Sequence, residues 1–110
     1  MSSMQLPPDT YQAFVQRYPK IAEGWEAIAS AGEEGPLDEK TCRLIKLAVA
    51  CAALREGAVH ANVRKALATG ITRKEIEQVI ALTAGTLGLP ATVAVFSWIE
   101  ELLSNRGGAG

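Results

Sequence analysis

The stretch that decides the fold of this chain is LDEKTCRLIKLAVACAALREGAVHANVRKALATG, residues 37–70. Its first half is apolar on almost every side of a helix, and only Lys46 interrupts the run Leu44–Leu54. A helix of this kind needs neighbours on more than one side. The pattern breaks at Arg55–Gly57 and resumes until Gly70. We therefore expect two consecutive helices, the second of which ends at a glycine.

Helical spacing continues on both sides of this stretch. Upstream, two short helices fit before and after Pro19, and Asp38 stands where the central helix needs an N-cap. Downstream, Thr72 and Glu75 have the spacing of a capping box, and Pro90 opens a last helix. The sequence has no alternating strand pattern and no repeat. It predicts an all-α fold, a bundle of about six helices.

The length of 110 residues suits one domain. Within that domain we expect N-terminal helices over residues 1–36 and a helical core over residues 37–104. Residues 105–110 are rich in glycine and are expected to form a disordered tail. A hydrophobic fraction of 48% with 21% charged residues is typical of a compact globular protein.

Charge and hydropathy exclude several classes of partner. Eleven basic and twelve acidic residues nearly balance, and the basic residues form no run, so no nucleic-acid partner is indicated. The longest uncharged apolar stretch, Leu47–Leu54, is far shorter than the roughly 20 residues that span a bilayer. The N-terminus has no basic start followed by an apolar segment. We expect a cytoplasmic protein with no membrane partner.

The two cysteines are poorly placed for a disulfide. Cys42 and Cys51 lie nine residues apart in one helical segment, about two and a half turns. At that separation their Cα atoms are too far apart to be bridged. We interpret both as buried thiols that act as small hydrophobic residues.

Glu56 and His60 are the candidate catalytic residues. They lie four positions apart, so on a continuous helix both side chains leave from one face and can exchange a proton. The alternative is a solvated helix pair, and a lone histidine is more often a satisfied polar group. A metal site is disfavoured because Glu56, His60 and Asn62 are the only cluster of possible ligands, and asparagine is a poor one.

Three neighbours of this pair are candidate substrate-binding residues. Asn62 follows His60 by two positions, which turns it about 200° around the helix axis, so the two face different sides. Arg55 and Arg64 flank the group and could bind a substrate carboxylate. The alternative is that both are ordinary exposed arginines.

Four segments of the chain together resemble the carboxymuconolactone decarboxylase and alkylhydroperoxidase D superfamily. They are LDEKT, EGAVHANVRKAL, ATGITRKEI and GLP, and the resemblance covers residues 37–103. It implies an alkylhydroperoxidase D-like helical subunit that forms trimers or hexamers, with active sites close to subunit contacts. It also implies one of two chemistries. Alkylhydroperoxidase-type members attack peroxides with a Cys-x-x-Cys pair, whereas decarboxylase members keep the helix and its histidine without that pair.

The chain departs from the superfamily pattern at several positions. Alignment on VRKALATGIT places the two cysteines at Arg55 and Ala58, so the redox pair is absent. The same alignment places the usual histidine at Asn62 and a glutamate of the preceding helix near Arg43. His60 lies in an EGAVH segment similar to a branch that typically reads His-x-His. Asparagine hydrogen-bonds but cannot carry a proton at neutral pH.

Three hypotheses about function follow. The first is a cofactor-free acid/base enzyme for a small carboxylated or lactone compound, with Glu56 as acid or base, His60 as its proton partner and Asn62 orienting the substrate. The second is a non-catalytic member that binds a ligand or serves as an oligomeric scaffold. Asn62 and Arg43, which stand where the superfamily usually has a histidine and a glutamate, favour this second hypothesis. The third is peroxidase activity through Cys42 or Cys51.

The apolar surface of the predicted helices exceeds what one small chain can bury. A chain of this size buries only about 60 to 70% of its unfolded surface. We therefore expect a homo-oligomer, a trimer or a hexamer, with an apolar interface above about 2,000 Å². The alternative is a monomer in which Lys46, Glu100 and Glu101 mark solvated faces. The surplus of the last helix comprises Val93, Val95, Phe96, Trp98, Ile99, Leu102 and Leu103.

Overall fold

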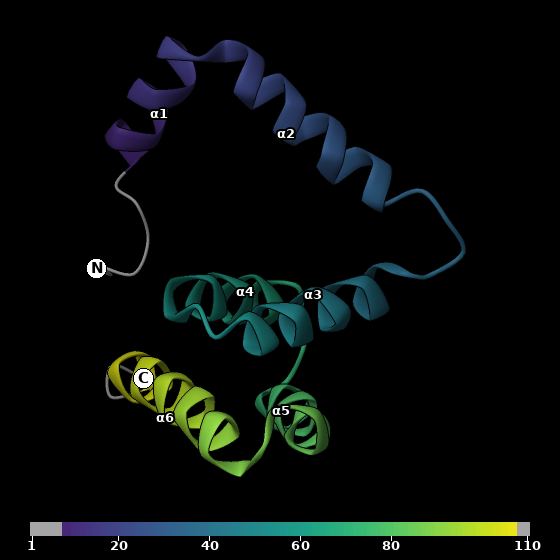
Figure 1. Ribbon diagram of the computed structural model, residues 1–110, viewed down its shortest axis with the longest axis vertical. Helices are drawn as coiled ribbons and strands as arrows, with labels where there is room; N and C mark the ends of the chain where they lie inside the picture. Colours follow the sequence, from purple (N-terminus) through teal and green to yellow (C-terminus); the bar gives the residue numbers. More distant parts are fainter. Residues whose placement is uncertain (1–7, 108–110) are drawn as a thin grey trace.

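The computed structural model describes residues 8–107, which form six α-helices (Figure 1). No strand occurs in this range, so the predicted all-α fold is confirmed. None of the helices within it is long and apolar enough to cross a membrane. The helices are α1 (Pro8–Arg17), α2 (Pro19–Gly32), α3 (Glu39–Ala53), α4 (Glu56–Ala68), α5 (Arg73–Leu87) and α6 (Leu89–Gly107).

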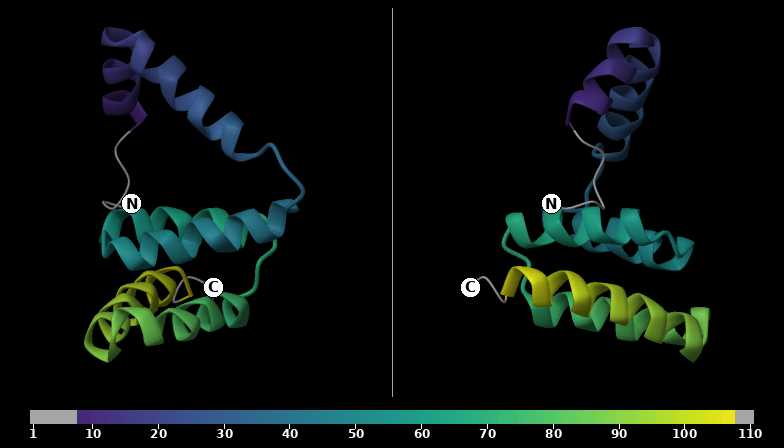
Figure 2. Two further views of the ribbon diagram at one scale, coloured as in Figure 1. Left: turned by 45° about the vertical axis from the view of Figure 1, so that its right-hand side comes forward. Right: turned by 90° about the vertical axis from the view of Figure 1, so that its left-hand side faces the viewer.

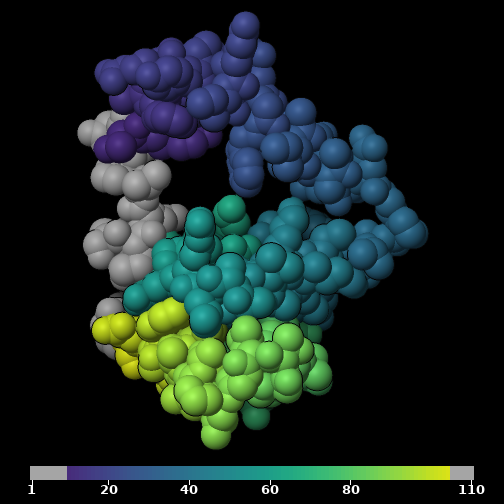
Figure 3. Space-filling view, viewed as in Figure 1, coloured from purple at the N-terminus to yellow at the C-terminus, as the bar shows by residue number. Residues whose placement is uncertain are grey.

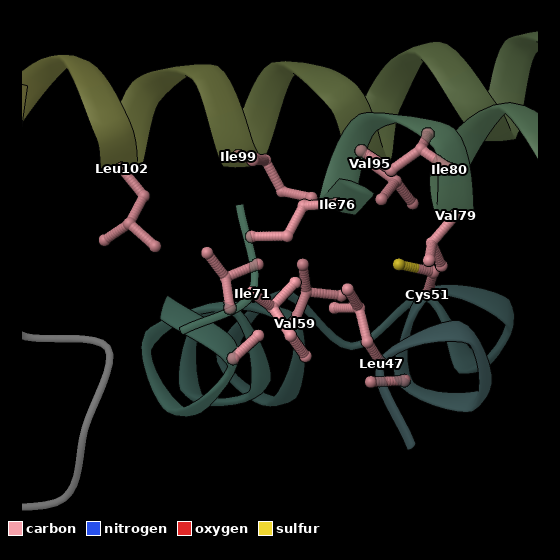
Figure 4. Packing of buried hydrophobic residues seen from close by; sticks show 13 residues of the cluster. Leu47, Cys51, Val59, Ile71, Ile76, Val79, Ile80, Val95, Ile99 and Leu102 are labelled. Carbon is pink, nitrogen blue, oxygen red and sulfur yellow. The ribbon is translucent and has the colours of Figure 1, made fainter. Parts of the chain in front are cut away.

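Helices α3 to α6 pack into a core of two layers, one of α3 with α4 and one of α5 with α6 (Figure 2). Each helix of one layer also packs against a helix of the other, α3 against α5 and α4 against α6. Between the layers lies a continuous apolar cluster (Figure 4). Its largest fully buried aliphatic side chains are Leu47, Val59, Val63, Ile76, Val95 and Ile99.

Local signals set the ends of the core helices. The Asp38 carboxylate accepts a hydrogen bond of 2.7 Å from the backbone N–H of Thr41, so it caps α3 as predicted. Thr72 and Glu75 form the predicted capping box at the start of α5. Each cap pairs backbone N–H groups that have no partner within the helix.

The break between α3 and α4 occurs at a strained residue. Leu54, the C-cap of α3, has φ of 56° and ψ of 37°, in the left-handed region. It is the one residue other than glycine with positive φ between residues 8 and 107. The chain turns here and resumes at Glu56, so the predicted break is present at the expected place.

Helices α1 and α2 form an arm, residues 8–32, that stands apart from the core. The two helices pack against each other, and the packing that joins α3 to α6 does not extend to them. Figure 3 shows open space between the arm and the core. Residues 33–38 connect the two parts.

The C-terminal helix extends beyond its expected end. Helix α6 continues to Gly107, into the stretch 105–110 that was expected to form a tail, and residues 108–110 lie outside the described part of the chain. Helix α5 continues through Gly85 and stops at Leu87. Gly88, with φ of 88°, then separates α5 from α6.

Candidate functional site

Helix α4 buries the ring of His60 against α6. Only 1% of this residue is exposed, and its Nε2 lies 3.1 Å from the backbone carbonyl oxygen of Trp98. A carbonyl oxygen only accepts hydrogen bonds, so Nε2 carries the hydrogen and donates it. The other ring nitrogen, Nδ1, is buried and has no hydrogen-bond partner among the described residues. A buried nitrogen without a partner is uncommon in proteins, and a functional role is one of its explanations.

Glu56 is the solvent-exposed neighbour of this ring. It is the first residue of α4, where the helix dipole favours a carboxylate. Its Oε2 is 3.9 Å from Nε2 of His60, which is within ion-pair range but beyond hydrogen-bond distance. The Glu56 side chain is 44% exposed, whereas that of His60 is 1% exposed. Of the two, Glu56 is therefore the group that a molecule arriving from solvent meets.

Asn62 occupies a different side of α4. Its Nδ2 donates to the carbonyl oxygen of Ala58 at 2.9 Å, and its Oδ1 accepts from Nη1 of Arg43 at 3.4 Å. The contact with Arg43 faces α3, whereas His60 contacts α6, as the spacing of two residues predicts. The structure brings Glu56 and His60 together and does not bring Asn62 to them.

The two flanking arginines differ in exposure. Arg55 is exposed and immediately precedes Glu56, at the N-cap of α4. Arg64 is half-buried, and all three nitrogens of its guanidinium group are shielded from solvent. Arg64 is therefore not an ordinary exposed arginine, while Arg55 is available to an incoming anion.

The two thiols are free and differ in burial. Cys51 lies fully in the core, and this burial raises its pKa to about 11. Cys42 is half-buried, with its Sγ 3.7 Å from the carbonyl oxygen of Leu37. The core position of Cys51 agrees with its prediction as a buried thiol, and Cys42 is more accessible than predicted. A protonated thiol is a weak nucleophile.

The largest described cavity lies elsewhere, between α3 and α5. It is about 600 Å³ in volume and is lined mostly by apolar side chains, among them Ile45, Val49 and Leu82. None of the five predicted site residues lines it. The apolar residues on almost every side of α3 predicted neighbours on more than one side of this helix. They did not predict that α3 and α5 would form this groove. Residues 8–107 also contain no group of three His, Cys, Asp or Glu side chains placed to hold a metal ion.

Comparison with known proteins identifies a family. The model of the carboxymuconolactone decarboxylase family matches residues 19–101, more than half of the chain. The matched range starts at the first residue of α2 and ends inside α6, so it includes both Glu56 and His60. No curated protein and no solved structure matches the chain.

Proposed function

Because the chain belongs to the carboxymuconolactone decarboxylase family, we propose that it is a cofactor-free acid/base enzyme for a small carboxylated or lactone compound. One observation carries this proposal: an exposed carboxylate, that of Glu56, lies 3.9 Å from the buried ring of His60. The same proposal places the enzyme in the cytoplasm as a homo-oligomer, a trimer or a hexamer.

In this proposal Glu56 exchanges the proton with the substrate. The carboxyl group is exposed, starts a helix and follows Arg55, whose exposed guanidinium is suited to hold a substrate carboxylate. A general acid or base has to come within hydrogen-bond reach of the proton that it moves, and exposure makes this possible for Glu56.

His60 acts through Glu56. The hydrogen bond to the Trp98 carbonyl fixes the orientation and the tautomer of its ring. The same nitrogen lies 3.9 Å from Oε2 of Glu56. Because its hydrogen is already donated to the Trp98 carbonyl, His60 positions the Glu56 carboxyl group by its proximity and not by a second full hydrogen bond.

For a carboxylated lactone the reaction is a decarboxylation. The bond between the ring carbon and the carboxylate breaks, carbon dioxide leaves, and the electron pair moves into the system conjugated with the lactone carbonyl. A proton from the Glu56 carboxyl group then replaces the lost carbon dioxide, and Glu56 recovers a proton from water. The substrate's own carbonyl accepts the developing charge, so the chemistry requires no cofactor.

Carboxymuconolactone, the substrate in the family's name, is the first compound to test, with carbon dioxide release as the measurement. We expect Glu56→Gln to lower kcat at least about a hundredfold, the usual effect of losing a general acid or base. His60→Gln should lower kcat less and change the pH profile. Glu101→Gln, which removes an exposed carboxylate on α6, is the matched control and should leave turnover unchanged. Unchanged turnover in Glu56→Gln would exclude the proposed role.

A second function is favoured by the contact between Asn62 and Arg43. At the superfamily's usual histidine position this chain has an amide whose oxygen accepts from Arg43 of α3 and whose nitrogen donates to the backbone of α4 itself, so both polar atoms are already in use. Such a replacement suits a member that binds a ligand or builds an oligomer without catalysis. If the wild type turns over no compound in a panel of carboxylated lactones but still binds one of them, this second function holds. The third hypothesis, thiol peroxidase activity, receives no support from the protonated thiol of Cys51.

A further inference from the structure

One apolar surface that the chain's own core does not cover is a face of the arm. Ile21, Trp25 and Ile28 are spaced so that they share one side of α2. They are 53%, 63% and 66% exposed. Within residues 8–107, no core helix makes more than a weak contact with α2. We call these three residues the arm ridge.

A second uncovered surface is the groove between α3 and α5, described above as a cavity of about 600 Å³. On its α3 side Ile45 and Val49 are 47% and 63% exposed, and on its α5 side Leu82 is 73% exposed. Its charged lining residue, Glu75, already pairs with Lys40 at 2.6 Å. The groove therefore offers an apolar surface and no unpaired charge.

The chain exposes more surface than a compact monomer of the same mass. The chain exposes 7519 Å². A compact monomer of 11.7 kDa exposes about 5,900 Å². The surplus of roughly 1,600 Å² exceeds the roughly 800 Å² that each partner buries in a standard interface and falls within the range of obligate dimers. The radius of gyration, 15.2 Å, also exceeds the roughly 13 Å of a compact chain of this length.

We propose that the arm of one subunit docks in the α3–α5 groove of a second copy of this chain. Helix α2 is about 21 Å long, and the α3 wall of the groove, from Thr41 to Ala52, runs about 17 Å, so one helix fits along the groove. A helix ridge packing into a groove between two helices is a standard mode of helix association.

A second copy of the chain supplies one arm for each groove and one groove for each arm. Each docked arm covers one ridge and one groove, so a reciprocal pair or a closed ring leaves neither surface exposed. Both surfaces are apolar, which suits an obligate interface and not a nucleic-acid or strongly charged partner. The inference goes beyond the proposed function, because neither Glu56 nor His60 lines the groove, and assembly and turnover can be measured separately.

The first experiment measures self-association of the full chain by sedimentation velocity at micromolar concentration. Trp25→Glu places a charge on the arm ridge, and Val49→Glu places one in the groove. Each should raise the dissociation constant on the order of thirtyfold or more, the effect of losing an interface hot spot. Ser30→Glu is the matched control, since it adds the same charge to an exposed position of α2 about half a turn from Ile21. Circular dichroism checks that all three variants remain helical.

The second experiment mixes the two disrupted variants. Trp25→Glu retains an intact groove, and Val49→Glu retains an intact arm, so an equimolar mixture should form pairs that neither variant forms alone. A mixture that stays monomeric contradicts the pairing of arm with groove. A wild-type monomer, whose arm folds into its own groove, overturns the proposal, as does an oligomer that neither substitution weakens or that Ser30→Glu weakens equally.

Discussion

Nε2 of His60 lies 3.1 Å from the backbone carbonyl oxygen of Trp98, so the single histidine of the chain joins α4 to α6. The two residues are 38 positions apart in the sequence, and the contact crosses from one layer of the core to the other. The histidine therefore has a structural role in the core in addition to any role beside Glu56.

His60→Ala should destabilise the fold. The substitution removes a fully buried side chain and leaves the Trp98 carbonyl without its donor. We expect the free energy of unfolding to fall by roughly 2 to 4 kcal/mol, measured by urea denaturation. Glu56→Gln alters an exposed group and should change stability by less than about 0.5 kcal/mol. Equal stability of His60→Ala and the wild type would show that the hydrogen bond and the packing of the ring contribute nothing.

Leu54→Gly should be more stable than Leu54→Ala. Leu54 has a φ of 56°, and this left-handed conformation costs residues with a Cβ roughly 1 to 2 kcal/mol. Both substitutions remove the same half-exposed side chain, but only glycine relieves the backbone strain. We expect a difference of about 1 kcal/mol in thermal or urea unfolding. If alanine is as stable as glycine at this position, the left-handed turn is not present in solution.

Cys51 should be unreactive in the folded protein. Burial raises its pKa to about 11, so at pH 8 almost none of it is thiolate. In a Cys42→Ser variant, a thiol reagent should find no rapidly reacting group under native conditions and one such group in denaturant. Rapid modification of the folded variant would contradict the buried position.

Two carboxylates at helix starts, those of Asp38 and Glu75, should make the fold less stable in acid. Hydrogen bonds from Thr41 lower the pKa of Asp38, and the contacts with Lys40 and with the backbone N–H of Thr72 lower that of Glu75. Their folded-state pKa values are thus below the unfolded ones of 3.8 and 4.5. The stability that they contribute is fully present above these unfolded values and is lost as the pH falls through the folded ones.

Urea unfolding at pH 7 and pH 3 measures this effect. Asp38→Asn and Glu75→Gln keep the capping geometry but cannot titrate, so each should reduce the loss of stability between the two pH values. Glu101→Gln, at an exposed carboxylate without a described hydrogen bond or ion pair, should not change it. An unaltered pH dependence in both cap variants would contradict the lowered pKa values.

The helices were predictable from the sequence because their signals are local. The apolar run of α3, the Asp38 cap and the box at Thr72 each lie within a few residues of the element that they define. The two central helices accordingly begin and end within about two residues of their predicted limits. The left-handed Leu54 was not predictable, since leucine carries no preference for that conformation.

The candidate site was predictable only in part. The spacing of four places Glu56 and His60 on one face of α4, and the structure finds them 3.9 Å apart. The burial of His60 depends on a backbone carbonyl of α6, and the position of Asn62 depends on Arg43 of α3. These are contacts between distant segments, which no local pattern encodes. The arm lies apart from the core because its helices make few contacts with the core helices, and no local pattern encodes this either.

The position of the arm ahead of the core has a consequence for synthesis in the cell. The ribosome releases residues 8–32 first and needs about 4 to 15 s more for the roughly 70 residues that complete the core, at the usual rate of translation. During that interval Trp25 and Ile28 are exposed on the nascent chain, while α3 and α5, which form the groove, are still incomplete. Polysomes, which hold several such chains close together, are therefore where chaperone capture or premature aggregation of this protein competes most strongly with correct folding.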